Sequence, residues 1–250
     1  MALPDSQDLL SRIRSGDPRA IGRLLTRIVH GDPQALALVE TLAARAPPRR
    51  RVGFTGPPGV GKSSLLGIVV REVRRRGQTA ALLLADPVSP RTGGAFLGDR
   101  VRLADLARDA GVFIRSLAHR SGPGRPTAGS DACARVLEAA GFDWIFFETV
   151  GVGQSETDVL ESVDARVLVL SPDSGDWHQM LNAGYLETAE LGVVNKSDRP
   201  GASTWARELE SLLPAAGGKE QRPRVVLTSA RTGSGASELL ARVEERLVAG

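Results

Sequence analysis

The first part of the chain repeats apolar residues at the three- and four-residue spacing of an amphipathic helix, over residues 7–46. Two breaks, Gly16-Asp17-Pro18 and Gly31-Asp32-Pro33, divide this pattern. In each break the aspartate is placed to cap a helix, and the proline suits a first helical turn. The pattern therefore predicts three helices, and we expect residues 1–48 to form an N-terminal helical extension of a larger unit over residues 49–250.

Residues 49–250 contain short, continuously apolar runs with helical patterns between them. Such runs are typical of strands that are covered on both faces, as in a parallel sheet. Strands are predicted at 52–55, 80–85, 112–117, 142–147, 167–170, 193–194 and 225–230. Helices are predicted at 63–76, 131–140 and 236–248, the second of them capped by Asp131. This alternation predicts an α/β fold with a mostly parallel central sheet and helices on both of its faces.

A glycine-rich loop with the spacing G-x-x-x-x-G-K-[ST] lies between the first predicted strand and the helix that follows it. This setting distinguishes a phosphate-binding loop from a glycine-rich turn with a stray lysine. Backbone N–H groups of residues 59–62 would face a polyphosphate, Lys62 would reach its β and γ oxygens, and Ser63 would bind Mg²⁺. The residues expected to contact the nucleotide here are Gly56, Pro57, Pro58, Gly59, Val60, Gly61, Lys62, Ser63 and Ser64.

Two acidic residues stand at the ends of predicted strands, which is where ligands bind in open α/β sheets. Asp86 ends one strand, and Glu148 ends another and is followed three residues later by Gly151. This spacing matches the D-x-x-G arrangement of nucleotide switches, with glutamate in place of aspartate. A carboxylate there can hold Mg²⁺ through water or orient an attacking water, and the Gly151 amide can sense a γ-phosphate. The alternative is a structural glutamate that caps a strand.

The sequence Asn195-Lys196-Ser197-Asp198 follows another apolar strand. Asp198 can accept two hydrogen bonds from the N1–H and 2-amino groups of guanine, which adenine lacks, and the stem of Lys196 can pack on the ring. A site built to pair these donors rejects bases without them. The last strand ends in Ser229-Ala230, whose backbone would meet the guanine O6. The chain is therefore predicted to bind GTP and GDP.

Composition narrows the choice of function. The chain has 250 residues, a net charge of +3, one cysteine and no apolar stretch long enough to span a bilayer. Its arginine runs at 49–51 and 74–76 flank a strand and end a helix, so we interpret them as solvated ends rather than as a nucleic-acid site. Cys133 lies in an alanine-rich helical pattern, which favours a small buried residue over a nucleophile. We expect a cytoplasmic protein that acts without nucleic acid or membrane.

Five motifs together resemble those of the MeaB/ArgK-type P-loop GTPases of the SIMIBI class. They are G-P-P-G-V-G-K-S at 56–63, D-P-x-S-x-R-T-G-G-x-x-L-G-D at 86–99, E-T-V-G-V-G-Q-S-E at 148–156, G-D-x-x-Q at 175–179 and N-K-x-D at 195–198. The long match that begins at Glu148 is more specific than the phosphate loop, which many nucleotide hydrolases share. The resemblance covers nearly the whole chain.

Members of that family are G-protein chaperones of cobalamin-dependent acyl-CoA mutases. The resemblance implies that the chain hydrolyses GTP to GDP, gates cofactor loading onto a mutase of the methylmalonyl-CoA type and protects that mutase from inactivation. It assigns catalysis to Lys62, Glu148 and Asp99. It also places Ser63, Asp86, Asp99 and Glu148 around Mg²⁺ and the catalytic water.

Some features depart from the family pattern. Val88 stands where a serine is usual, and Asn182 in the third switch stands where the family has a lysine that couples to the mutase. Relatives also continue into a C-terminal helical arm used for dimerisation, whereas this chain ends at Gly250. The resemblance alone implies a homodimer, and residues 1–250 do not include that arm.

Two other functions compete with this interpretation. A metallochaperone GTPase of related fold would need a Cys/His metal site, but the chain has one cysteine, and His30, His119 and His178 are scattered along it. A kinase of the arginine/ornithine-transport type would need a nucleophile beside the γ-phosphate, and none stands out, which favours transfer to water. Basal turnover is expected to be slow, because no arginine finger is fixed in the motifs and Arg91 and Arg120 lie on predicted loops.

Overall fold

A computed structural model describes residues 6–43, 50–87, 103–119, 128–149, 159, 161–173, 186, 189–213 and 225–249 of the chain. Its strands are β1 (Arg50–Thr55), β2 (Ala80–Pro87), β3 (Val112–His119), β4 (Trp144–Glu148), β5 (Ala165–Leu170), β6 (Leu191–Val194) and β7 (Val225–Leu227). Its longer helices are α1 (Ser6–Arg14), α2 (Pro18–Val29), α3 (Pro33–Ala43), α4 (Lys62–Arg75), α6 (Ala128–Ala139), α10 (Ala202–Leu212) and α11 (Ala236–Ala249). A short 3₁₀ helix, η1 (Leu106–Arg108), precedes β3.

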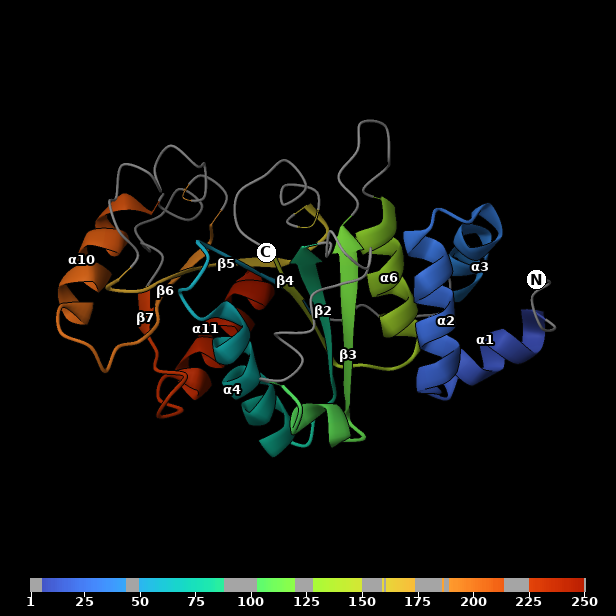
Figure 1. Ribbon diagram of the computed structural model, residues 1–250, viewed down its shortest axis with the longest axis horizontal. Coiled ribbons are helices and arrows are strands. Elements are labelled where there is room, and N and C mark those ends of the chain that lie inside the picture. Colours follow the sequence, from blue (N-terminus) through green and yellow to red (C-terminus); the bar gives the residue numbers. More distant parts are fainter. Residues whose placement is uncertain are drawn as a thin grey trace.

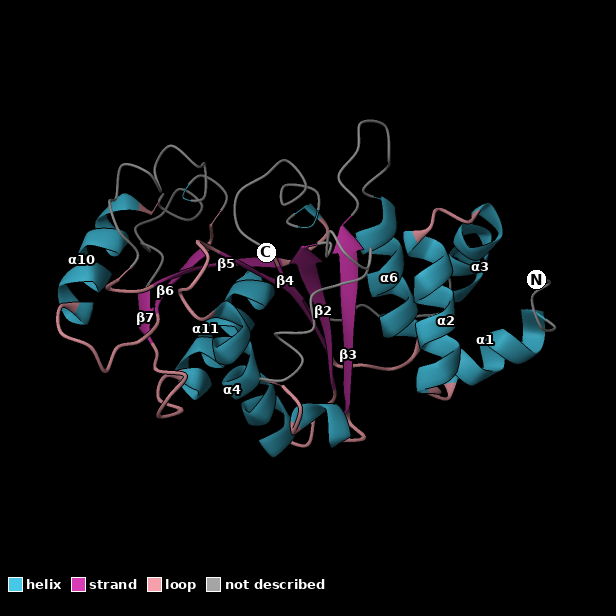
Figure 2. Ribbon diagram, viewed as in Figure 1, coloured by secondary structure: helices cyan, strands magenta, loops and turns pink. Residues whose placement is uncertain are grey.

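The described strands form one parallel sheet in the order β3-β2-β4-β1-β5-β6-β7. In the middle of the sheet, Phe54 of β1 lies opposite Glu148 of β4, and Thr55 lies opposite Leu168 of β5. Helices flank the strands on both sides (Figure 2). Because all these strands run the same way, their carboxyl ends meet at one edge. The prediction of an α/β fold with a mostly parallel sheet is confirmed.

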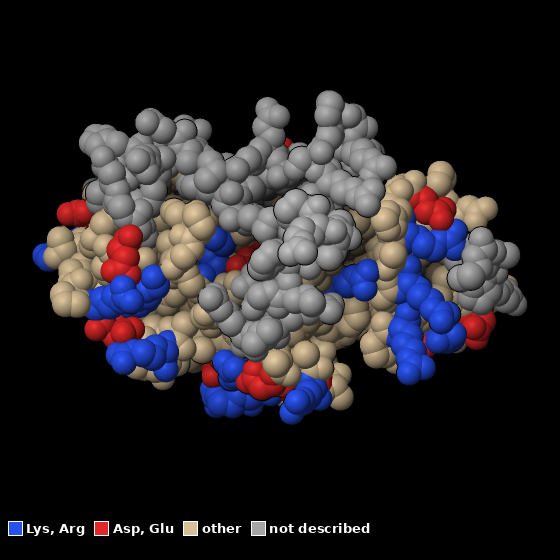
Figure 3. All heavy atoms as spheres, in the orientation of Figure 1, with Lys and Arg blue, Asp and Glu red and all other residues tan. Residues whose placement is uncertain are grey.

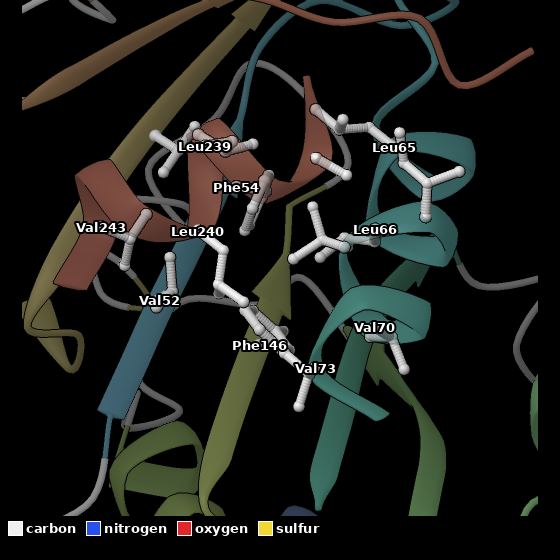
Figure 4. Close-up of a cluster of buried hydrophobic side chains, with 14 of the residues drawn as sticks. Val52, Phe54, Leu65, Leu66, Val70, Val73, Phe146, Leu239, Leu240 and Val243 are labelled. Carbon is white, nitrogen blue, oxygen red and sulfur yellow. The ribbon is translucent and has the colours of Figure 1, made fainter. Parts of the chain in front are cut away.

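One face of the sheet packs against α4 and α11, which lie side by side (Figure 1). Alternate strand residues point to this face, including Val52 and Phe54 of β1 and Phe146 of β4 (Figure 4). The helices contribute Leu65, Leu66, Val70, Val73, Leu239, Leu240 and Val243 to the same cluster. This packing fixes α4, whose first residues follow the phosphate loop, relative to the strand that precedes the loop.

The intervening strand residues point to the opposite face. There Leu83, Ile145 and Phe147 pack against α6 and the three N-terminal helices, while Leu168 and Leu170 pack against α10. Helices α1, α2 and α3 therefore share one hydrophobic core with α6 and the sheet. The boundary at residue 48 stays a prediction, since the helices on its N-terminal side are packed onto the larger unit.

The N-terminal helices have the predicted breaks and caps. A carboxylate oxygen of Asp17 accepts a hydrogen bond from the backbone N–H of Arg19 at 2.8 Å, and Asp32 accepts one from Gln34 at 2.9 Å. Each aspartate satisfies an amide that has no partner inside its helix. The prediction of three helices separated at these two sites is confirmed.

Two elements differ from their predicted bounds by three residues at one end. Helix α6 begins at Ala128, so Asp131 lies in its first turn instead of capping it, and its carboxylate pairs with Arg51 at 2.7 Å and Arg135 at 2.8 Å. The last strand ends at Leu227, because the chain turns there and the Ser229 N–H bonds to the Ser234 carbonyl. Cys133 is buried as predicted, and burial raises the pKa of its thiol to about 12.

The interpretation of both arginine runs as solvated ends was wrong for Arg51. Its side chain is only 15% exposed, and its guanidinium donates from Nε to Glu138 at 2.6 Å and from Nη1 to Asp131 at 2.7 Å. Arg74 and Arg76 also form ion pairs with carboxylates. On the face seen in Figure 3, basic and acidic side chains lie next to each other, so much of the positive charge is neutralised locally.

Candidate functional site

The phosphate loop follows β1, and two of its glycines combine a positive φ with a close neighbour. Gly56 has a φ of +139°, and a Cβ atom there would lie 2.1 Å from the carbonyl oxygen of Val169 in the neighbouring strand β5. Gly61 has a φ of +92°, and its Cβ would lie 2.6 Å from Asn195 Nδ2. These close approaches let the loop pass between β5 and the loop after β6. The predicted glycine-rich loop between a strand and a helix is confirmed.

Lys62 is the first residue of α4, and its side chain is buried. The Nζ atom donates to the carbonyl oxygen of Gly56 at 2.7 Å and to that of Pro57 at 3.0 Å. The ammonium therefore bends back over the start of the loop. A buried positive charge beside backbone N–H groups at a helix N-terminus makes this end of α4 suited to an anion.

Ser63 and Glu148 meet at the carboxyl edge of the sheet. The Ser63 hydroxyl donates to Glu148 Oε1 at 2.6 Å, and both side chains are buried. The two residues are 85 positions apart, and the pairing of β4 with β1 brings them together. A buried hydroxyl beside a buried carboxylate provides the oxygen donors that a hard divalent cation prefers.

Two buried threonines contact each other where the phosphate loop and the segment after Glu148 begin. Thr55 precedes the phosphate loop and Thr149 follows Glu148. The Thr149 hydroxyl donates to Thr55 Oγ1 at 3.1 Å, and its N–H donates to the carbonyl oxygen of Phe54 at 3.0 Å. This arrangement continues the pairing of β1 with β4 as far as the two functional side chains.

Asn195 connects the phosphate loop to the end of β7. Its Nδ2 donates to the carbonyl oxygen of Val60 at 2.9 Å, while its Oδ1 accepts from the N–H of Ala230 at 3.2 Å. Its backbone N–H bonds to Leu170 of β5 at 2.8 Å. The side chain is buried, so it acts as a structural brace between three loops at this edge.

Lys196 has a φ of +58°. Among the described residues, it is the one non-glycine residue with a positive φ. A left-handed conformation costs about 1–2 kcal/mol for such a residue. The Nζ atom donates to the carbonyl oxygen of Gly59 at 2.8 Å and to Asp173 Oδ2 at 3.3 Å. The lysine side chain thus contacts both the phosphate loop and Asp173, which follows β5.

The Asp198 carboxylate lies beside the loop that follows β7. Its Oδ1 accepts from the Ser229 hydroxyl at 2.5 Å, and its Oδ2 pairs with Arg231 at 3.0 Å. The hydrogen bond from Ser229 lowers the pKa of the Asp198 carboxyl below its ordinary value, so this group is charged at neutral pH. A charged carboxylate accepts hydrogen bonds without donating any, which suits it to two N–H groups of a base.

The structure brings many of the predicted site residues to one edge. These are the phosphate loop of residues 56–64, Glu148, Asn195, Lys196, Asp198, Ser229 and Ala230. Asp86 lies near the carboxyl end of β2, opposite Ala118 of β3, and its side chain is not among those that the structure describes. Asp99, Gly151 and Asn182 lie outside the described residues, so the roles predicted for them stay predictions.

Sequence reasoning missed Asp173 and Arg231, which contact the residues of the N-K-x-D motif. A signal existed for Asp173, because it follows a predicted strand and side chains at strand ends meet at the sheet edge. Among the described residues, no cluster of three or more His, Cys, Asp or Glu side chains could hold a metal by itself. In the same residues, no helix has the length and apolar character needed to cross a bilayer.

Comparison with known proteins relates this site to one family. The sequence model described as Methylmalonyl Co-A mutase-associated GTPase MeaB matches residues 19–248. A protein of Pyrococcus horikoshii named as a GTPase is 39% identical over 242 residues, which cover 95% of this chain and 76% of that protein.

Two further matches extend the comparison. The mitochondrial methylmalonic aciduria type A homolog of Mus musculus is 37% identical over 194 residues, which cover 76% of this chain and 47% of that protein. The crystal structure of LAO/AO transport system kinase has a TM-score of 0.74 at 26% identity, and the match covers 100% of this chain and 78% of that one.

Proposed function

This chain belongs to the family of methylmalonyl-CoA mutase-associated GTPases, and on that premise we propose that its GTP hydrolysis serves a cobalamin-dependent acyl-CoA mutase. In this proposal the GTPase gates cofactor loading onto the mutase and protects it from inactivation. The observation that carries the proposal is the family match over residues 19–248, together with the site at the carboxyl edge of the sheet. The chain itself is a P-loop GTPase, and we propose that it works in the cytoplasm.

The described side chains have separate tasks in the proposed nucleotide site. Lys62 leaves the carbonyls of Gly56 and Pro57 and binds the β and γ oxygens of GTP, with the N–H groups of the loop around them. Asp198 accepts the guanine N1–H and 2-amino groups, and the stem of Lys196 packs on the ring. Asn195 keeps the base loop and the phosphate loop in register through its bonds to Val60 and Ala230.

The Ser63–Glu148 pair fits Mg²⁺, because both side chains offer oxygen ligands in a buried place next to the phosphate loop. The ion would neutralise charge that develops on the phosphates during transfer. In this proposal Ser63 would be a ligand of the ion, and Glu148 would hold it through water or orient the attacking water. Asp86 and Asp99 remain the further predicted ligands.

Glu148→Gln is the variant that tests this assignment. It keeps the size of the side chain and an oxygen to accept the Ser63 hydroxyl, but it removes the charge that orients water or holds the ion. We expect the kcat for GTP hydrolysis to fall about 100-fold while GDP still binds. Glu245→Gln, at a side chain that is 64% exposed on α11, is the matched control and should hydrolyse GTP at the normal rate. Normal hydrolysis by Glu148→Gln would contradict the role of Glu148.

The partnership is tested by co-purification with the cobalamin-dependent mutase of the same organism, in GDP and in a non-hydrolysable GTP analogue. We expect binding that depends on which nucleotide is present, and its loss in Lys62→Ala. Binding that is equal in all states, or absent while GTP hydrolysis is intact, would contradict the chaperone proposal. A homodimer is a separate prediction, which the mass of the purified chain in solution would test.

A second candidate function follows from the match to a structure described as a transport system kinase. A kinase of that kind would transfer the γ-phosphoryl group to a side chain or a second substrate instead of water. Incubation with γ-labelled GTP distinguishes the two activities. Label released as inorganic phosphate supports hydrolysis, whereas label retained on the protein would support the kinase.

A further inference from the structure

Asp173 lies just beyond β5, at the edge of the sheet that carries both the phosphate loop and the N-K-x-D motif. Its Oδ2 accepts a hydrogen bond from Lys196 Nζ at 3.3 Å and also pairs with Arg199 Nη1. Lys196 and Arg199 belong to one turn, since the N–H of Arg199 bonds to the carbonyl oxygen of Lys196 at 2.9 Å. One carboxylate from the segment after β5 thus contacts both cations of the turn that would recognise the base.

Lys196 needs such a partner because its backbone is strained. Its φ of +58° is unfavourable for a residue with a side chain, and strained residues persist where their surroundings fix them. The ammonium donates to two oxygens, the Gly59 carbonyl of the phosphate loop and the Asp173 carboxylate. Together they hold the lysine stem across the phosphate loop, where a bound base would lie against it.

The exposure of the three side chains indicates how much their ion pairs can contribute to the stability of the fold. Asp173 is 42% exposed, Lys196 28% and Arg199 52%. Ion pairs this exposed add little to the stability of the fold, because water screens them. A loss of the Asp173 carboxylate should therefore leave the fold almost as stable and act mainly on the position of Lys196.

We propose that Asp173 is a positioning residue for nucleotide binding, which holds Lys196 in place to pack on the purine ring. The inference rests on the proposed guanine site and adds a residue from outside its motifs. Asp173 acts on every purine nucleotide, since the lysine stem packs on the ring and not on the 2-amino group. Asp198, by contrast, selects guanine through its hydrogen bonds.

The test is the dissociation rate of fluorescent GDP and IDP from the full chain, measured by displacement with excess unlabelled nucleotide. Asp173→Asn should release both nucleotides about three- to five-fold faster. Asp173→Glu should restore a slower release, because it keeps the charge. Asp105→Asn removes a similarly exposed ion pair with Arg71 on α4 and should release nucleotide at the normal rate. Melting temperatures should be nearly the same for all of these variants.

A double-mutant cycle shows whether Asp173 acts through Lys196. In the Lys196→Met background, the ammonium is gone, so Asp173→Asn should cause no further acceleration. Equal dissociation rates in Asp173→Asn and the wild type, or full additivity of the two substitutions, would overturn the inference while the wild type still binds GDP. A wild-type chain that binds no guanine nucleotide would instead overturn the proposed guanine site itself.

Discussion

Gly56 shows how strictly single residues of the phosphate loop depend on backbone geometry. It combines a φ of +139° with a position where a Cβ would lie 2.1 Å from a carbonyl oxygen of β5. Gly77, after α4, also has a positive φ of +76°, but no atom lies within 4 Å of its Cβ position. Replacing Gly77 therefore measures the cost of the backbone conformation alone, whereas replacing Gly56 adds the cost of a steric clash.

We predict that Gly56→Ala lowers the free energy of unfolding by about 3 kcal/mol or more and abolishes GDP binding, because the loop has to move away from β5. Gly77→Ala should cost only about 1 kcal/mol and leave binding intact. Urea denaturation and a nucleotide titration measure both effects. A Gly56→Ala protein with normal affinity for GDP would contradict this account of the loop.

Single functional residues can be predicted from the sequence where the spacing within one short segment determines their chemistry. Lys62 and Ser63 follow from the G-K-[ST] spacing, and the structure places them next to Gly56 and Glu148. Asp173 and Arg231 are different, because their contacts depend on which strands are neighbours and on how far each loop turns. A pattern along one segment contains no information about a partner on another.

At the scale of elements, the junction between β1 and α6 depends on one arginine. Arg51 is on β1, and its guanidinium lies between the carboxylates of Glu138 and Asp131 of α6. Burial alone would lower the pKa of this guanidinium, but the hydrogen bonds that it donates to the two carboxylates raise the pKa above its ordinary value. The sequence suggested an exposed arginine run here, because the helix face that receives the side chain cannot be identified from the run itself.

We predict that Arg51→Met destabilises the chain by about 2 kcal/mol, because Glu138 would remain as a buried carboxylate without its main cation. Arg71→Met, which removes an ion pair between side chains that are 48% and 59% exposed, is the control. It should change the free energy of unfolding by no more than about 0.5 kcal/mol. Equal effects of the two substitutions would show that the Arg51 cluster adds nothing beyond a surface pair.

A second element-scale prediction concerns the C-terminal end of α4. Hydrogen bonds from Arg75 and then from Arg76 lower the pKa of Glu72 from 4.5 to about 2. The stabilisation from these bonds is present above pH 4.5 and is lost as the pH falls towards 2, because in that range the unfolded state takes up a proton that the native carboxylate does not bind. Glu72→Gln should therefore be about 1 kcal/mol less stable than the wild type at pH 6. The difference should shrink at pH 3, and a difference that stays constant with pH would contradict the assignment.

At the scale of the whole molecule, a parallel sheet collects functional side chains from distant segments at a single edge. The phosphate loop, Glu148, Asn195 and Ser229 come from the ends of four strands, and the strand order places them together. The fold class follows from continuous apolar strands alternating with helices. The packing of α1 to α3 onto α6 does not follow from that pattern, because an amphipathic helix shows that it has a buried face but not what covers it.

We propose that GTP hydrolysis by this chain is controlled by a mutase. The most direct test is the steady-state rate of GTP hydrolysis with rising concentrations of the cobalamin-dependent acyl-CoA mutase from the same organism, with Lys62→Ala as the inactive control. We expect slow hydrolysis by the chain alone and a saturating increase of about tenfold or more with the mutase, since the partner would complete the transition-state contacts. A rate that stays the same at every mutase concentration would contradict it.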